Sequence, residues 1–189
     1  MMRKWLVVLI LLVGSLSAFA VEGKDESREN RKLVYKVDIK DEIGPSIWRL
    51  VKRSFDRATD ENADVILVHM NTYGGMVVYA DSLRSLILNY PKPVWVFIDN
   101  NAASAGALIS IACDRIYMRE GANIGAATVV NQTGDAMPDK YQSYMRSMIR
   151  ATAQAHGKDT VMENGQSVIR WKRDPRIACL LYTSPSPRD

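Results

Sequence analysis

The stretch NAASAGALISIA, residues 101–112, decides the fold of this chain and locates its chemistry. A short run of β-branched and aromatic residues precedes it, which is typical of a buried strand, and small helix-forming residues follow Ser104. Ser104 therefore lies where a strand gives way to a helix, and the free N–H groups of a first helical turn can stabilise an oxyanion. We interpret Ser104 as a nucleophile. The alternative is an N-cap serine on a closely packed core helix.

The length and composition suit one domain preceded by a leader. The chain has 189 residues, 47% of them hydrophobic, which is enough for a real core. Residues 1–20 combine a basic start, an apolar run and a small-x-small cleavage site, which is the layout of a secretory signal peptide. We expect residues 21–32 to be a flexible lead-in outside the cytoplasm. An uncleaved membrane anchor is the alternative.

The last stretch, CLLYTSPSPRD at residues 179–189, changes composition abruptly and resembles translated sequencing-adapter sequence. We expect the native reading frame to end near Ala178; an ordinary Ser/Pro-rich disordered tail is the alternative. With Cys179 in this stretch, Cys113 stands alone and is interpreted as a small buried apolar residue rather than a disulfide partner. The net charge of +4 does not indicate a nucleic-acid partner, and no cluster at ligand spacing indicates a metal.

Repeated strand and helix patterns indicate an α/β domain. Strands are expected over residues 33–39, 64–70, 94–98 and 115–118, and helices from residue 44 and over 76–89, 105–112 and 139–156. Such pairs favour parallel strands and a sheet covered on both faces. The helical spacing predicts buried faces that include Leu50 on the first helix, Leu86 or Leu88 on the second, and Tyr141 and Tyr144 on the last.

Two further segments supply candidate catalytic groups. Gly74 and Gly75 directly follow a buried strand, so the backbone can turn there and point N–H groups outward. A plain turn is the alternative. Lys140 begins the last helix at the edge of its apolar stripe, where the helix dipole and partial burial would favour a neutral amine suited to general-base work. A solvated surface lysine is the alternative. The two histidines, His69 within a strand and His156 at a helix end, do not fit a Ser-His-Asp triad.

Four motifs together resemble the ClpP-class membrane serine proteases, and more narrowly the N-terminal protease domain of NfeD-type proteins. They are NTYGG (71–75), NNAASAGA (100–107), GANIGAA (121–127) and MPDKYQSYMRSM (137–148). The resemblance covers about residues 33–178 and implies a ClpP/crotonase-like spiral of β-β-α units, truncated at its C-terminus. It implies the site residues as follows: Ser104 as nucleophile, Lys140 as general base, the backbone N–H groups of Gly75 and Ala105 as oxyanion hole, and Gly74 and Tyr144 in substrate binding.

The function implied by this resemblance is an extracytoplasmic, membrane-associated endopeptidase with a Ser-Lys dyad and no cofactor. Its expected substrates are hydrophobic segments of membrane proteins such as stomatin homologues. The resemblance also implies a homodimer or higher oligomer, with membrane spans beyond the truncated end and the catalytic domain facing the periplasm or exterior. Two alternatives stay open: a crotonase-type acyl-CoA enzyme, which would use the same N–H pair on an enolate, and a non-catalytic scaffold that binds a stomatin-like partner.

Overall fold

A computed structural model describes residues 31–131 and 133–183 of the chain, so the expected signal peptide lies outside the described residues. The chain divides into two units, residues 1–31 and 32–189, and the account below concerns the second. Its elements in chain order are β1 (Val34–Ile39), α2 (Pro45–Asp60), β2 (Val65–Thr72), α3 (Val77–Leu88), β3 (Val94–Ala103), α4 (Ala105–Ala112), β4 (Arg115–Met118), β5 (Asn123–Gly125), α5 (Asp139–Ala155), β6 (Lys158–Glu163), β7 (Gln166–Trp171) and α6 (Pro175–Thr183).

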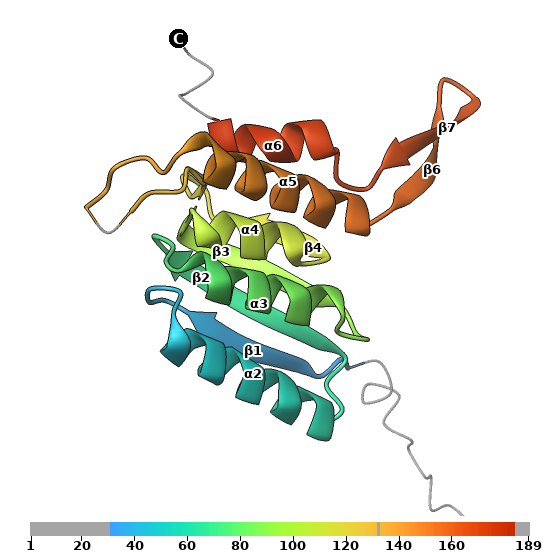
Figure 1. Ribbon diagram of the computed structural model, residues 1–189. Coiled ribbons are helices and arrows are strands. Elements are labelled where there is room, and N and C mark those ends of the chain that lie inside the picture. Colours follow the sequence, from blue (N-terminus) through green and yellow to red (C-terminus); the bar gives the residue numbers. More distant parts are fainter. Residues whose placement is uncertain (1–30, 132, 184–189) are drawn as a thin grey trace, which may run out of the picture. The chain divides into compact units, whose positions relative to one another are not determined.

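A parallel sheet in the order β1-β2-β3-β4 forms the centre of this unit, and α2, α3 and α4 lie side by side on one face of it (Figure 1). The long strand β3 pairs with β4 along its first half and with β5 along its second half, where Asn101 lies opposite Asn123. This change of partner occurs just before Ser104. The strands and helices expected from the sequence are therefore confirmed, and β5 adds a short strand at the candidate site.

Helix α2 begins at Pro45, whose fixed φ suits the first helical position. Its buried face carries Ile47, Val51, Phe55 and Ala58 at helical spacing. The prediction that Leu50 shares this face was wrong, since 47% of that residue is exposed. Leu50 falls at the margin of this buried stripe, outside the surface that the sheet covers.

Replacing Phe55 by alanine is expected to lower the free energy of unfolding by about 3–5 kcal/mol, because the ring is 2% exposed and leaves a cavity. The ring also packs edge-on against Tyr90, with centroids 4.9 Å apart. Urea denaturation followed by circular dichroism measures the loss. Leu50→Ala on the same helix is the matched control and should cost less than about 1 kcal/mol. Equal losses in the two variants would contradict the burial described here.

The sheet is covered on one face only, which corrects the expectation of a fully covered sheet. Side chains alternate between buried and partly exposed along β1, β2 and β3. On the open face, His69 of β2 lies between Asp38 of β1 and Asp99 of β3, at 2.8 Å and 3.5 Å from their carboxylate oxygens. Apolar side chains, Leu67 and Phe97 among them, share this face with the polar ones and are partly exposed.

Two more helix faces differ from expectation. Helix α3 fully buries Ala80, Leu83 and Ile87, while Leu86 and Leu88 are only partly buried against the core. On α5, Tyr141 is 41% and Tyr144 is 58% exposed. The buried face of α5 consists of Gln142, Met145, Met148, Ile149, Thr152 and Ala153. The stripe of α5 turns toward α4 and α6, the two helices it contacts most, and the tyrosines are left beside it.

The C-terminal part continues past α5 into an antiparallel hairpin, β6 and β7, and then into α6. Helix α6 runs across the boundary expected at Ala178, with Ala178 and Tyr182 both buried. That boundary stays a prediction. Cys113 at the end of α4 is completely buried, as expected, and burial raises the pKa of its thiol to about 12. A thiol of this kind stays protonated and is a poor nucleophile.

Candidate active site

Ser104 occupies the junction of β3 and α4 in a backbone conformation that side chains rarely adopt. Its φ is +51° and its ψ is −114°, close to the first central position of a type II′ turn, which glycine normally fills. Strain of this kind costs on the order of 1–3 kcal/mol and persists where the surrounding structure enforces it. Here the N–H of Ser104 donates to the carbonyl of Gly125 on β5, at 2.8 Å. The side chain of Ser104 makes no capping hydrogen bond to α4, so the N-cap alternative is not supported.

Gly74 brings a second backbone segment against Ser104. A Cβ placed on Gly74 would lie 2.6 Å from the Cβ of Ser104 and 3.1 Å from its Oγ. The φ of Gly74, +114°, is also one that favours glycine. Only glycine allows this approach, so the turn after β2 and the turn after β3 meet at the Ser104 hydroxyl.

Gly75 and Ala105 carry the two expected oxyanion donors. Ile43 fixes the Gly75 peptide from both sides, because its N–H donates to the carbonyl of Gly74 and its own carbonyl accepts from the N–H of Met76, each at 2.8 Å. The N–H of Gly75 has no acceptor among the described residues. The N–H of Ala105 belongs to the first turn of α4, where intrahelical acceptors are lacking. Both groups are therefore available to a ligand.

Thr72 supports this turn, and the sequence analysis missed it. The residue is buried at the end of β2, where its Oγ1 accepts from the N–H of Gly74 at 3.1 Å and donates to the carbonyl of Asp41 at 2.7 Å. Its methyl group also lies where a Cβ on Gly106 would reach, at 2.8 Å, so α4 packs directly against it. The signal was a threonine just before the glycine pair, but only the fold reveals its acceptor on Asp41.

Lys140 lies in the first turn of α5, and it is exposed rather than partly buried as predicted. Its ammonium nitrogen sits 5.0 Å from the centre of the Tyr141 ring. No hydrogen bond joins Lys140 to Ser104 among the described residues, and the side-chain contact recorded for Lys140 is with Tyr141. Lys140 and Tyr144 instead line an apolar groove of about 580 Å³. The other lining residues are Val77, Val78, Asp81, Val129, Tyr141 and Met145.

Gln142 holds the start of α5 in place and was not anticipated. Its amide nitrogen donates to the carbonyls of Val129 and Met137, both at 2.8 Å, and its amide oxygen accepts from the N–H of Val129 at 3.0 Å. These bonds close the loop that leads from β5 to Lys140. A glutamine two residues after the candidate base gave no sign of this role, because the acceptors come from the loop backbone.

Neither histidine is positioned for triad chemistry. His69 donates its Nδ1–H to Asp38, and His156 donates its Nε2–H to the carbonyl of Ile111 at 2.7 Å. Burial opposes the charge of Asp38, but hydrogen bonds from Lys36, His69 and Lys40 outweigh it and lower the pKa of that carboxyl to about 2. Burial lowers the pKa of His156. Both rings are thus committed to structural contacts away from Ser104.

Within residues 31–131 and 133–183, no group of three or more His, Cys, Asp or Glu side chains is arranged to hold a metal ion. Over the same residues, every helix is too short or too polar to cross a membrane.

Comparisons with known proteins identify a family and several relatives of this chain. The family model of the NfeD1b N-terminal domain matches residues 33–167. The membrane protein NfeD1b of Bacillus subtilis is 31% identical over 133 residues, which are 70% of this chain and 30% of that protein. The membrane-bound protease PH1510 of Pyrococcus horikoshii is 26% identical over 172 residues, covering 85% of this chain and 36% of that protein.

The structural likeness agrees with the sequence matches. A solved 1510-N membrane-bound stomatin-specific protease, a lysine-to-alanine variant in complex with a substrate peptide, superimposes with a TM-score of 0.68 at 25% identity over 82% of this chain and 67% of that one. The expected ClpP/crotonase-like α/β class is thereby confirmed. The chain spans about a third of the length of the curated relatives, 30% and 36%. It belongs to the family of NfeD1b N-terminal domains.

Proposed function

We propose that this domain is a serine endopeptidase that uses Ser104 as nucleophile and Lys140 as general base. The observation that carries the proposal is the strained φ of Ser104, held against Gly74 beside two available backbone N–H groups. Strain at a serine that caps nothing is difficult to explain by packing alone, and it is common at active sites. The relationship to the protease PH1510 supports the same activity.

In the proposed reaction, Ser104 Oγ attacks a peptide carbonyl and transfers its proton to the side-chain amine of Lys140. The N–H groups of Gly75 and Ala105 donate to the oxyanion that forms. Lys140 then gives the proton to the leaving amine, and a water molecule hydrolyses the acyl-enzyme by the same route in reverse. The rigid turns around Gly74 and Ile43 keep the donors fixed, so little reorganisation is needed as charge develops.

Lys140 must swing toward Ser104 for this mechanism, and its exposure leaves the side chain free to do so. Hydrogen bonds in catalytic groups are often long or absent before substrate binds. Solved forms of 1510-N include variants with a single lysine and with a single serine replaced by alanine, which supports a role for these two residue types. Gln142 would keep the start of α5 in place during the movement.

The apolar groove beside Lys140 is the proposed binding site for the substrate. It begins at Val77 and Val78, directly after the glycine turn, and Tyr144 forms part of its wall. A groove of this character favours an apolar peptide segment. The 1510-N relative is specific for a stomatin homologue, so we propose a hydrophobic segment of a stomatin-like protein as the substrate, membrane association of the whole protein on the extracytoplasmic side, and a homodimer or higher oligomer.

The test is cleavage of a hydrophobic peptide from a stomatin homologue by the full chain and by Lys140→Ala. Loss of a general base should slow cleavage by about 10²–10⁴-fold. Lys52→Ala, an exposed lysine on α2, is the matched control and should cleave like the parent. Added primary amines should restore part of the activity of Lys140→Ala because they replace the missing base. Undiminished cleavage by Lys140→Ala would refute the assignment of the base, and a folded parent that binds the peptide without cleaving it would favour the scaffold alternative.

A further inference from the structure

A second cavity lies at the other end of α4 from Ser104 and has no part in the chemistry proposed above. Its volume is about 380 Å³. Three segments form it: the start of β4, the C-terminal end of α5, and the residues that follow β7. Helix α4 has eight residues, so its ends are roughly 12 Å apart. The cavity is therefore separate from the candidate active site.

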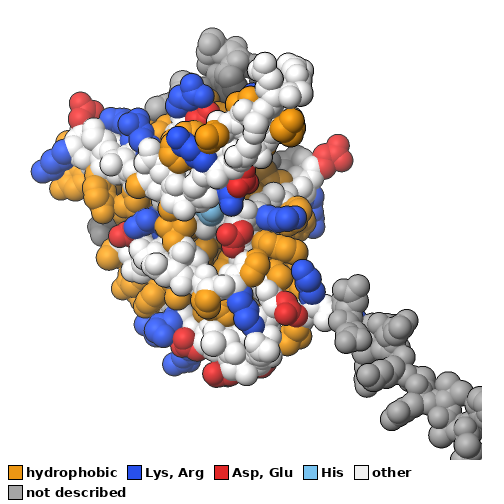
Figure 2. Space-filling model, turned by 90° about the vertical axis from the view of Figure 1, so that its right-hand side faces the viewer, with side chains coloured by type: hydrophobic (Ala, Val, Ile, Leu, Met, Phe, Trp, Pro, Cys, Tyr) orange, Lys and Arg blue, Asp and Glu red, His pale blue; other side chains and the backbone are white. Residues whose placement is uncertain are grey.

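The cavity carries an excess of positive charge. Arg115, Lys172 and Arg173 line it together with one carboxylate, Asp114. An oxygen of Asp114 already accepts the N–H of Val94 at 2.7 Å. On the face toward which the C-terminal end of α5 points, a histidine lies among both basic and acidic side chains (Figure 2). A cavity lined by three cationic side chains and one carboxylate attracts anions.

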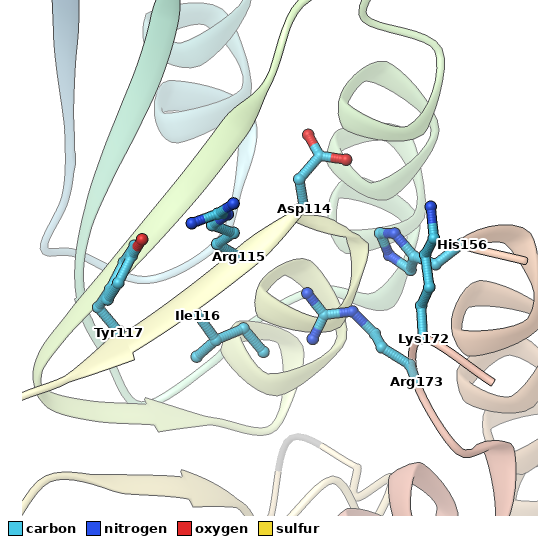
Figure 3. A pocket seen from close by; sticks show the side chains of 7 residues that line it. All are labelled: Asp114, Arg115, Ile116, Tyr117, His156, Lys172 and Arg173. Carbon is cyan, nitrogen blue, oxygen red and sulfur yellow. The ribbon is translucent and has the colours of Figure 1, made fainter. Parts of the chain in front are cut away.

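The donors of this cavity are held in place before any ligand arrives. Figure 3 shows Arg173 reaching toward the start of β4, with His156 and Lys172 beside it. The guanidinium of Arg173 donates to the carbonyl of Cys113, and the guanidinium of Arg115 lies 5.5 Å from the centre of the Trp95 ring. A guanidinium has five N–H donors, so Arg173 keeps several for a ligand. Fixed donors lower the entropy cost of binding.

The partial burial of Arg173 also favours an anion. Burial lowers the pKa of Arg173, because its charge is poorly solvated. The ion pair of Lys172 with Asp159, 3.4 Å apart, is half exposed and contributes little. Asp114 supplies part of the counter-charge of Arg173, and an oxyanion in the cavity would add to it.

We propose that this cavity binds a phosphate group, carried either by a free phosphate compound or by the headgroup of an anionic lipid. Arginine recognises phosphate through paired N–H donors, and three cations suit a group with more than one charged oxygen better than a single carboxylate. The competing explanation is that Arg173 and His156 only cap the carbonyls at the end of α4. The proposal does not depend on proteolysis.

The first test is thermal unfolding of the full chain in inorganic phosphate against sodium chloride of equal ionic strength. At phosphate about tenfold above its Kd, the Tm should rise by roughly 3–6 °C. The double variant Arg115→Gln/Lys172→Gln should lose this rise and keep its fold, because both side chains are exposed. Lys52→Gln/Arg53→Gln on α2 removes equal charge elsewhere and should keep the rise. The proposal is overturned if phosphate gives no rise, or the same rise in the cavity variant.

A second measurement separates the two sources of phosphate. Sedimentation with phosphatidylglycerol vesicles compares the parent with the cavity variant, so any contribution from the N-terminal residues cancels. Weaker sedimentation of the variant, together with competition by inorganic phosphate, assigns the lipid headgroup. A phosphate-dependent Tm rise with equal sedimentation of parent and variant assigns a free phosphate compound. Equal sedimentation together with no phosphate-dependent Tm rise leaves only the capping explanation; the lack of a Tm rise by itself already refutes a phosphate site.

Discussion

Ser104→Ala is expected to abolish peptide cleavage, with a loss on the order of 10⁴–10⁶-fold in kcat. The reason is that the hydroxyl begins the covalent step, and the oxyanion donors alone cannot replace a nucleophile. Peptide-bond cleavage followed by mass spectrometry measures the effect. In the parent, a fluorophosphonate probe should label Ser104 and no other serine, because the hydroxyl is partly exposed beside Gly74.

The stability of Ser104 variants separates a strained nucleophile from an ordinary turn serine. Ser104→Gly relieves the positive φ without losing a cap, since the side chain makes no capping bond. Relief of the strain should raise the free energy of unfolding by about 1–3 kcal/mol, and the greater backbone entropy of glycine in the unfolded chain should lower it by about 0.5–1 kcal/mol. The variant should therefore be more stable by about 1 kcal/mol, and it should be inactive because it lacks the hydroxyl. Ser46→Ala in the first turn of α2 is the control and should change neither property. Full activity in Ser104→Ala would rule out this nucleophile.

The fold was predictable because its local signals were strong. Runs of β-branched residues, breakers and helical spacing located strands β1 to β4 and helices α2 to α5. The errors came from tertiary context. Leu50, Tyr141 and Tyr144 all have the spacing of a buried face, yet the neighbouring elements do not extend over them. Periodicity gives the direction of an apolar stripe but not the width of the surface that covers it.

In the candidate site too, local sequence signals predicted some residues, and tertiary contacts revealed the others. The sequence located Ser104 and the glycine pair because small residues directly after buried strands are unusual and have a clear backbone meaning. It missed Thr72, Ile43 and Gln142, whose hydrogen-bond partners are backbone atoms from distant segments. The contact between Lys140 and Ser104 stays a prediction, since a long exposed side chain is placed by its rotamers and by substrate rather than by the fold.

Gly75→Ala is expected to remove one oxyanion donor and slow cleavage by about 10²–10³-fold in kcat. The new Cβ would lie 2.6 Å from the backbone nitrogen of Ile43 and nearer still to its carbonyl oxygen. A backbone neighbour cannot rotate away as a side chain can, so the turn must move and carry the Gly75 N–H with it. The φ of +150° adds strain for any side chain.

The matched control is Gly121→Ala, at a φ of +79° with open space around the added Cβ. It reproduces the backbone strain without the clash, so its activity should stay near that of the parent. Circular dichroism and the Tm of both variants establish that they fold. The changes in kcat and in KM relative to the parent are then measured separately. A Gly75→Ala protein that folds and keeps its kcat would show that this N–H does not contact the oxyanion. A fall in kcat with little change in KM places the loss in the transition state, where an oxyanion donor acts.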